Sequence, residues 1–315
     1  MASYPWRLLP LVSRSLPLAL YLAAYAVTLF VMHTQLGFGV AEPLFVLLLF
    51  GVALSLLAWW ATRAARPRDI AVAHPQQEAT VLAVYVVVVV AFLTWGLPGA
   101  RALSAQPVAQ SLLGTAAKLL VFVLVPLMLW RGLWRYRLTQ FVDFPAGLRG
   151  HWRAALVMSL ALLVLQVVVG RAPKDLAALH PHATELLVSV LVTGPWLFVE
   201  VGIVEEFFFR GLLQARLAAV TRSEPSGLVL MAVIFGLAHA PGFYLRPAGT
   251  GEALGTHPTL LMAIGYSVVL TSVTGFFLGI LWMRTRNLLL VALVHTAGDL
   301  LPNLADTIRL WRLGA

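Results

Sequence analysis

The ionisable residues that lie inside apolar segments of this chain gather in its C-terminal part. An ionisable side chain at the centre of a transmembrane helix costs about 2.5–3.5 kcal/mol on insertion scales, so a functional explanation becomes the default for each one. Carboxylates and imidazoles are groups that transfer protons in general acid–base catalysis. Six such residues occur from position 200 onward, against only Lys118 in the first five spans: Glu200, Glu205, Glu206, His239, His295 and Asp299.

The first motif with usable spacing reads Glu205-Glu206-Phe-Phe-Phe-Arg210. On a helix, Glu206 and Arg210 are four residues apart and share a face, so we expect them to form an ion pair. Glu205 is rotated by about 100° from Glu206 and is left without that partner. One carboxylate is therefore predicted to be structural and the other to be available for chemistry. The competing interpretation is that both carboxylates pair with basic groups on a neighbouring helix.

The second motif is Phe235-Gly-Leu-Ala-His239. The two rings lie four residues apart, so the phenyl ring can pack beside the imidazole and hold it. A single histidine in a helix is equally well explained as a structural residue. This motif alone does not decide between a structural and a catalytic histidine.

The third motif is His295-Thr-Ala-Gly-Asp299, again with a spacing of four residues. Both side chains then point to one face, where the carboxylate can orient the imidazole or bind beside it. The alternative is a polar pair at the end of a helix, because Gly298 and Pro302 are helix-ending signals.

The three motifs are expected to meet at a similar depth in a membrane. With a rise of about 1.5 Å per residue, Glu205 lies about 15 Å, His239 about 20 Å and His295 about 12 Å from the basic ends of their segments. Three separate helices would thus bring one carboxylate and two imidazoles together.

The elements that position these residues are predicted to be transmembrane helices. The 315 residues are 60% hydrophobic and 11% charged, with a mean hydropathy of +0.89, whereas soluble domains are about 45–50% apolar and about 25% charged. Apolar runs long enough to cross a bilayer recur along the chain. We expect an all-α bundle of eight or nine spans, with runs at 16–32, 43–62, 80–97, 111–130, 153–170, 186–209, 227–240, 259–283 and 287–303.

The net charge of +9 is distributed as a membrane protein distributes it. The basic residues stand singly or in pairs between the apolar runs without forming a basic face, which argues against a nucleic-acid partner. Alternate loops differ in their basic content, 15 residues against 6, with Arg210 and Arg216 counted in the richer set. This bias predicts a cytoplasmic N-terminus. The composition, rich in Ala, Leu, Val and Arg, suggests a bacterial inner membrane.

Two parts of the chain differ in their motifs. Residues 1–183 form N-terminal spans without a diagnostic motif, and residues 184–315 contain all three motifs. The absence of cysteine excludes disulfides, thiolate metal ligands and a cysteine nucleophile.

The ordered motifs Glu-Glu-x-x-x-Arg, Phe-x-x-x-His and His-x-x-x-Asn/Asp resemble those of the CAAX prenyl endopeptidase and bacteriocin-processing (CPBP, or ABI) family of intramembrane proteases. The resemblance implies that Glu205 activates a water with help from His239, while His295 and residue 299 stabilise the oxyanion. Glu206, Arg210 and Phe235 would then support the site.

Position 299 departs from part of that family. The prenyl-protein-processing members have Asn there, and an ionised Asp cannot donate to an oxyanion as Asn can. Two alternatives follow. Either Asp299 is protonated through burial, or it orients His295 instead of contacting the oxyanion.

The nearest rival is a zinc-dependent version of the same protease. Glu205, His239 and His295 are acceptable zinc ligands, but the compact signature His-Glu-x-x-His is absent. The resemblance favours a glutamate-type mechanism with no cofactor, and zinc stays possible. Serine-type and aspartyl-type intramembrane protease motifs are also absent.

Two non-catalytic interpretations remain: a transporter, in which buried charges relay protons, and a bacteriocin-immunity protein that keeps the fold without the activity. The intact motifs favour catalysis. The expected partners are membrane lipid and a protein or peptide substrate with a membrane-associated C-terminal segment, processed in a CAAX-type or a myxosortase-type reaction.

Overall fold

The computed structural model describes residues 11–67, 70, 72–141, 147–245, 254 and 258–311, with the side chains of 11–14 and 311 excepted. These residues form helices and connecting turns, and no strand occurs among them. Four of the basic residues counted for the predicted orientation lie outside the described residues: Arg7, Arg68, Arg246 and Arg312.

The helices confirm a polytopic membrane protein. Eight of them are long and apolar enough to cross a bilayer, and a bent pair, Trp152–Val168 with Ala172–Leu179 at 63°, makes a ninth if it counts as one span. Each of these nine overlaps one of the nine predicted runs, and several extend beyond it: the span predicted at 186–209 continues to Thr221. The length of each apolar run therefore accounts for the membrane helix found there, because a helix needs a run of this length to cross a bilayer.

The chain divides into two compact units, each assembled from separate segments: unit 1 is Met1–Leu57, Asp69–Thr94 and Leu212–Met283, and unit 2 is Ala58–Arg68, Trp95–Gly211 and Arg284–Ala315. The boundary at residue 183 was drawn from where the three motifs occur in the sequence, and it stays a prediction.

Unit 1 holds all or most of α1 (Leu11–Leu36), α2 (Ala41–Val46), η2 (Leu47–Leu54), α4 (Pro75–Ala91), α12 (Ala215–Thr221), α13 (Glu224–Ala238), α14 (Ala240–Tyr244), α15 (Leu260–Tyr266), η9 (Ser267–Thr271) and α16 (Ser272–Thr285). Unit 2 holds α5 (Leu97–Arg101), α6 (Pro107–Leu119), η4 (Leu120–Leu124), α7 (Val125–Trp134), η5 (Leu138–Gln140), α8 (Trp152–Val168), α9 (Ala172–Leu179), α10 (Ala183–Leu197), η7 (Phe198–Ile203), α11 (Val204–Glu206) and α17 (Leu288–Trp311). Four elements pass from one unit into the other: α3 (Ser55–Ala61), η3 (Phe92–Gly96), η8 (Phe207–Gln214) and the end of α16. The η elements are π-helical, except η5, which is a 3-10 turn.

Small residues let the helices of unit 1 approach closely, as transmembrane helices often do. A Cβ added at Gly236 of α13 would stand 2.5 Å from the backbone oxygen of Ser267. One added at Gly227 would stand 2.6 Å from the backbone nitrogen of Ala218 on α12. Glycine at these two positions therefore fixes how closely α13 packs against its neighbours.

Unit 1 also contains a buried ion pair that the sequence did not predict. Arg216 Nε lies 3.0 Å from Glu78 Oε2, and both side chains are fully buried. The assignment of Arg216 to a basic loop was wrong, and so was that of Arg210, which is fully buried in unit 2. Both lie in helical segments that continue the sixth apolar run, and each is paired with a carboxylate, so neither reports on the topology of a loop.

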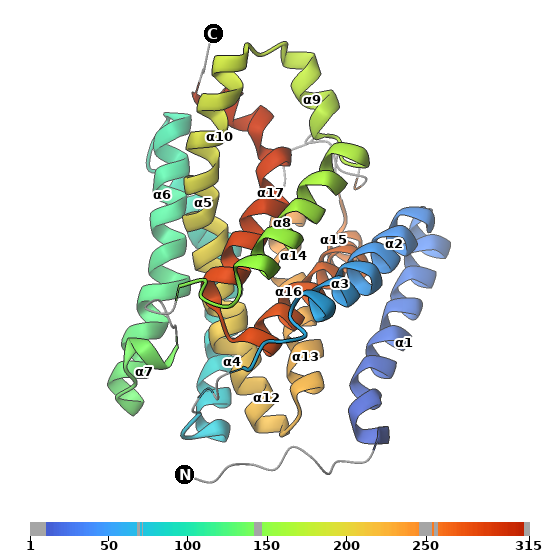
Figure 1. Cartoon of the computed structure of the whole chain (residues 1–315), viewed down its shortest axis with the longest axis vertical. Coiled ribbons are helices and arrows are strands. Elements are labelled where there is room, and N and C mark those ends of the chain that lie inside the picture. The colour runs from blue at the N-terminus through green and yellow to red at the C-terminus, as the bar shows by residue number, and fades with distance from the viewer. Residues whose placement is uncertain are drawn as a thin grey trace. The chain divides into compact units, whose positions relative to one another are not determined.

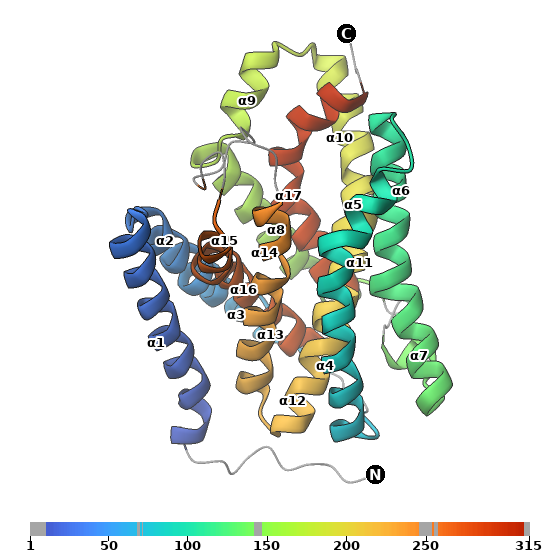
Figure 2. The ribbon, with the colours of Figure 1, turned by 180° about the vertical axis from the view of Figure 1, so that it is seen from behind.

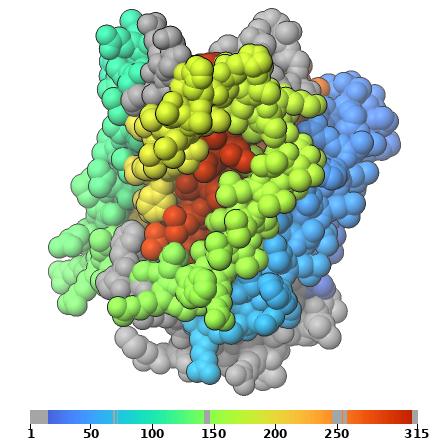
Figure 3. Space-filling view, turned by 45° about the horizontal axis from the view of Figure 1, so that its top comes forward, coloured from blue at the N-terminus to red at the C-terminus, as the bar shows by residue number. Residues whose placement is uncertain are grey.

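In unit 2, α17 packs between α8 and α10. Figure 1 and its reverse view in Figure 2 show α10 alongside α17. Figure 3 shows the red atoms of α17 between the yellow-green atoms of α8 and α9 and the yellow atoms of α10. This central helix carries the third motif.

The predicted helix end near Gly298 and Pro302 is wrong, because α17 continues to Trp311. Proline cannot donate a hydrogen bond to the carbonyl four residues earlier, which here belongs to Gly298. The Nε2 amide of Gln166 on α8 donates to that carbonyl. A neighbouring side chain thus supplies the donor that proline lacks, as is common in membrane helices.

Candidate active site

The first motif lies in a segment whose winding changes from π to α and back. Glu200 belongs to η7, Glu205 to α11, and the π-helical η8 follows directly. Backbone hydrogen bonds in a π-helix join residues five apart, so such residues come nearly above one another, and π segments are frequent at functional sites. This winding accounts for Glu200 and Glu205 contacting the same neighbouring side chain.

That neighbour is Lys118, near the end of α6. Its ammonium Nζ lies 3.4 Å from Glu205 Oε1 and 3.7 Å from Glu200 Oε1. The side chains of Lys118 and Glu205 are 13% and 12% exposed. The sequence had marked Lys118 only as the one basic residue inside the first five spans, without a role. Its isolation in an apolar run was the signal for a buried carboxylate partner.

Glu206 is fully buried and has two partners. Arg210 Nη1 donates to its Oε1 over 2.8 Å, which confirms the pair predicted from their spacing. The same oxygen lies 2.6 Å from Nδ1 of His295 on α17. The sequence missed this second contact, because it joins residues 89 positions apart. Glu206 therefore connects the first motif to the third.

His295 has a carboxylate beside each of its ring nitrogens. Because Arg210 pairs with Glu206 as a carboxylate, which only accepts, Nδ1 of His295 is the donor in their hydrogen bond. Nε2 lies 3.7 Å from Asp299 Oδ2, which is beyond the usual hydrogen-bond length. The Asp299 side chain is 38% exposed and so is only partly buried.

His239 and Phe235 belong to unit 1, at the C-terminal end of α13. Their ring centroids are 4.8 Å apart in an edge arrangement, which confirms the predicted packing. His239 Nδ1 lies 2.8 Å from the backbone carbonyl of Phe235. A carbonyl only accepts, so Nδ1 carries the proton and Nε2 of the neutral ring is the basic nitrogen. The meeting of His239 with Glu205 stays a prediction from the sequence.

Residues 184–301 match a family model described as type II CAAX prenyl endopeptidase Rce1-like. This segment is an Rce1-like domain. The match bears out the resemblance to the CPBP family, and it indicates a membrane endopeptidase. No curated protein and no solved structure matches the chain. The first, second and third motifs all lie inside the Rce1-like domain, whereas Lys118 lies outside it.

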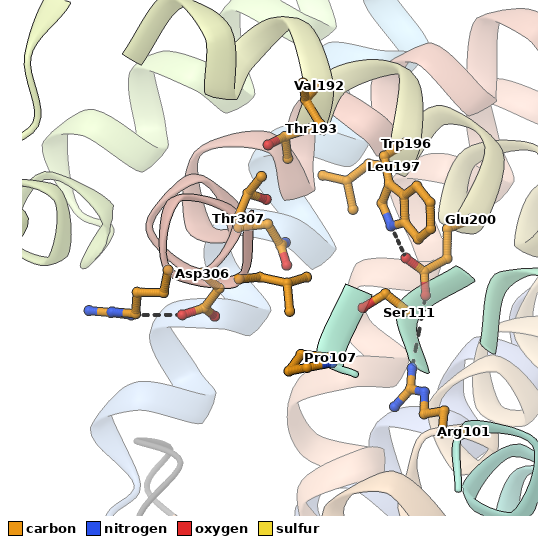
Figure 4. Close-up of a pocket in the computed structure, with 13 residues that line it drawn as sticks. Arg101, Pro107, Ser111, Val192, Thr193, Trp196, Leu197, Glu200, Asp306 and Thr307 are labelled. Carbon is orange, nitrogen blue, oxygen red and sulfur yellow. Dashed lines mark hydrogen bonds and ion pairs between the residues drawn. The ribbon is translucent and has the colours of Figure 1, made fainter. Parts of the chain in front are cut away.

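Unit 2 contains a pocket of about 620 Å³ that is lined in part by Glu200, five residues before Glu205. Figure 4 shows Glu200 at the wall of this pocket. Its Oε2 accepts a hydrogen bond of 2.6 Å from the indole Nε1 of Trp196, and its Oε1 lies 4.0 Å from Arg101 Nη2. The volume is in the range of small-ligand sites, which combine apolar walls with a few polar groups. It is lined by Arg101, Pro107, Ser111, Val192, Thr193, Trp196, Leu197, Glu200, Asn303, Asp306, Thr307, Arg309 and Leu310.

The zinc alternative asks for three ligands close together. Within either unit, the described His, Asp and Glu residues form no group of three that could hold a metal ion. The proposed set of Glu205, His239 and His295 draws on both units. A zinc-dependent Rce1-like mechanism therefore stays a prediction to be tested in solution.

Proposed function

We propose that this protein hydrolyses a peptide bond of a membrane-associated protein or peptide, near the C-terminus of its substrate. The observation that carries the proposal is that two adjacent carboxylates have different partners. Glu206 is fixed by Arg210 and His295, while Glu205 stands apart from that pair and is held by Lys118. We propose that Glu206 has a structural role and that Glu205 acts in the reaction.

In the proposed reaction, Glu205 takes a proton from a water molecule, and the resulting hydroxide attacks the scissile carbonyl carbon. His239, through its basic Nε2, assists this proton transfer. The tetrahedral intermediate then collapses, its C–N bond breaks, and the proton held by Glu205 or His239 passes to the leaving amine. Water is consumed, and a new carboxyl terminus and a new amino terminus form.

His295 is proposed to stabilise the oxyanion. Its Nδ1 already donates to Glu206, so Nε2 can donate as well only when the ring carries both protons. We propose that Asp299 orients the ring from the Nε2 side rather than contacting the oxyanion. Donors placed in advance where charge develops are among the largest contributions to catalysis.

The substrate is proposed to reach Glu205 through the pocket at Glu200. The pocket has charged and hydroxyl-bearing walls with apolar patches between them, which suits a short peptide segment. The match to prenyl endopeptidases supports a segment that the bilayer holds through a lipid or an apolar tail. Both CAAX-type and myxosortase-type processing meet this description.

The test compares the C-termini of membrane proteins in cells that carry the wild-type protein, Glu205→Gln or His239→Ala. We expect a set of new C-termini that depends on both residues while the abundance of the protein stays the same. Glu185→Gln is the matched control, because Glu185 only caps the exposed start of α10 and glutamine serves there equally well. The proposal would be refuted if cells with Glu205→Gln had the same C-termini as cells with the wild-type protein. It would also be refuted if cells with the wild-type protein had the same C-termini as cells lacking the protein.

A further inference from the structure

The contacts of Lys118 join the proposed catalytic carboxylate, Glu205, to Glu200, which lines the pocket in unit 2. Besides Glu205 Oε1 at 3.4 Å, its Nζ approaches Glu200 twice, at Oε1 over 3.7 Å and at the backbone carbonyl over 3.5 Å. An ammonium group has three donors and no acceptor. Three acceptors from two acidic residues therefore surround it.

Glu200 is the fixed end of this chain of contacts. The indole Nε1 of Trp196 donates to its Oε2 over 2.6 Å, and Arg101 lies 4.0 Å from its Oε1. Held from these sides, Glu200 can anchor Lys118, and Lys118 can in turn fix Glu205. The charges balance, since Lys118 and Arg101 face Glu200 and Glu205.

A lysine inside a span is expensive unless a carboxylate compensates it, so two roles compete. Lys118 either only neutralises two buried carboxylates, or it also sets the direction of the Glu205 carboxylate. The family match begins at residue 184 and assigns no role to a residue of α6.

We propose that Lys118 is a positioning residue for Glu205, anchored by Glu200, and this inference rests on the function proposed above. One oxygen of Glu205 is held on Lys118, which fixes the plane of the carboxylate toward its water and the scissile carbonyl. A misplacement of about 1 Å at a reacting group can cost about 100-fold in rate. Lys118 therefore acts on the rate of the chemical step and not on the binding of the substrate.

Three variants separate the two roles: Lys118→Met, Lys118→Arg, and Lys118→Met combined with Glu200→Gln. The first removes the charge and leaves an apolar side chain of similar length. The second keeps the charge on a planar group. The double variant removes one positive and one negative charge, so it restores the charge balance without restoring the contact to Glu205.

The purified proteins are assayed in nanodiscs with a synthetic peptide of the cut sequence that the wild-type protein yields in cells, and Tm is measured in parallel. We expect kcat to fall about 100-fold in Lys118→Met with KM within about twofold. We expect Lys118→Arg to recover at least about tenfold of that loss, since the charge remains. In the double variant, Tm should return toward that of the wild type while kcat stays low.

Recovery of kcat together with Tm in the double variant would overturn the proposal, because Lys118 would then serve charge balance alone. Wild-type kcat in Lys118→Met would overturn it as well. These failures differ from failure of the proposed function, in which the wild-type protein cuts nothing or Glu205→Gln cuts equally well.

Discussion

Glu206 and His295 are joined by a hydrogen bond of 2.6 Å between Oε1 and Nδ1, although they lie on different helices. The bond fixes the rotation of the imidazole and determines which nitrogen carries a proton toward Glu206. Arg210 binds the same oxygen of Glu206, so this carboxylate holds two neighbouring side chains in place. The two adjacent glutamates therefore differ in their partners: Glu206 is bound by Arg210 and His295, and Glu205 by Lys118.

Replacing Glu206 should damage stability more than replacing Glu205. Glu206→Gln leaves the fully buried Arg210 without its carboxylate, and breaking a buried pair typically costs about 3–5 kcal/mol. Glu205→Gln removes a weaker contact to Lys118 and should lower Tm only slightly while abolishing cleavage. Thermal unfolding in detergent micelles measures the Tm of both variants. Equal losses of Tm would contradict the division of roles between the two carboxylates.

The pair of Glu78 and Arg216 should behave as a structural unit of its own. Glu78→Gln or Arg216→Met should each destabilise the protein by about 3–5 kcal/mol, because each leaves one charge buried and uncompensated. The double variant Glu78→Leu with Arg216→Met should be less damaging than either single change, since no buried charge remains. Chemical denaturation in micelles tests this order, and an additive double variant would argue against the pairing.

Gln166 should contribute to the stability of the protein only while position 302 is proline. Gln166→Leu removes the donor to the Gly298 carbonyl and should cost about 1–3 kcal/mol. In Pro302→Ala, the backbone N–H of residue 302 can reach that carbonyl, so the added cost of Gln166→Leu should shrink markedly. A double-mutant cycle on Tm measures this coupling. Independent effects of the two substitutions would show that Gln166 serves another purpose.

Asp299→Asn tests whether this carboxylate orients His295. An orienting role depends on the negative charge facing Nε2 across 3.7 Å, so we expect kcat to fall about tenfold or more, a part of the roughly 10²–10⁴-fold that general acid–base catalysis contributes. Substrate binding should be little changed. Unchanged cleavage by the asparagine variant would refute the orienting role, and increased cleavage would favour residue 299 as a donor to the oxyanion.

Removal of metal ions should leave the activity intact if the glutamate-type reaction is correct. The purified protein is treated with a strong chelator, passed through a desalting column and assayed again. Loss of cleavage that returns on addition of Zn²⁺ would establish the zinc-dependent version. Metal analysis of the purified protein gives an independent measurement, because a resident zinc ion would be retained at close to one per chain.

Local rules determined much of this protein from sequence. The length of the apolar runs placed the membrane helices, and a spacing of four residues predicted the contacts of Glu206 with Arg210 and of Phe235 with His239. These predictions succeed because they depend on the period of one helix, which every residue along it shares. The three motifs also sufficed to indicate the family, since short patterns on separate helices keep their order in the chain.

The tertiary structure decided which charges meet across helices. Lys118 contacts Glu205, His295 contacts Glu206, and Arg216 contacts a glutamate 138 positions away. Such pairs depend on how each helix is rotated against its neighbours, and in the case of Glu200 and Glu205 on a local change to π winding. Likewise, the continuation of α17 beyond Pro302 depends on an amide from α8. Pattern along one helix cannot reveal these contacts, because the donor and the acceptor are brought together only when the helices pack.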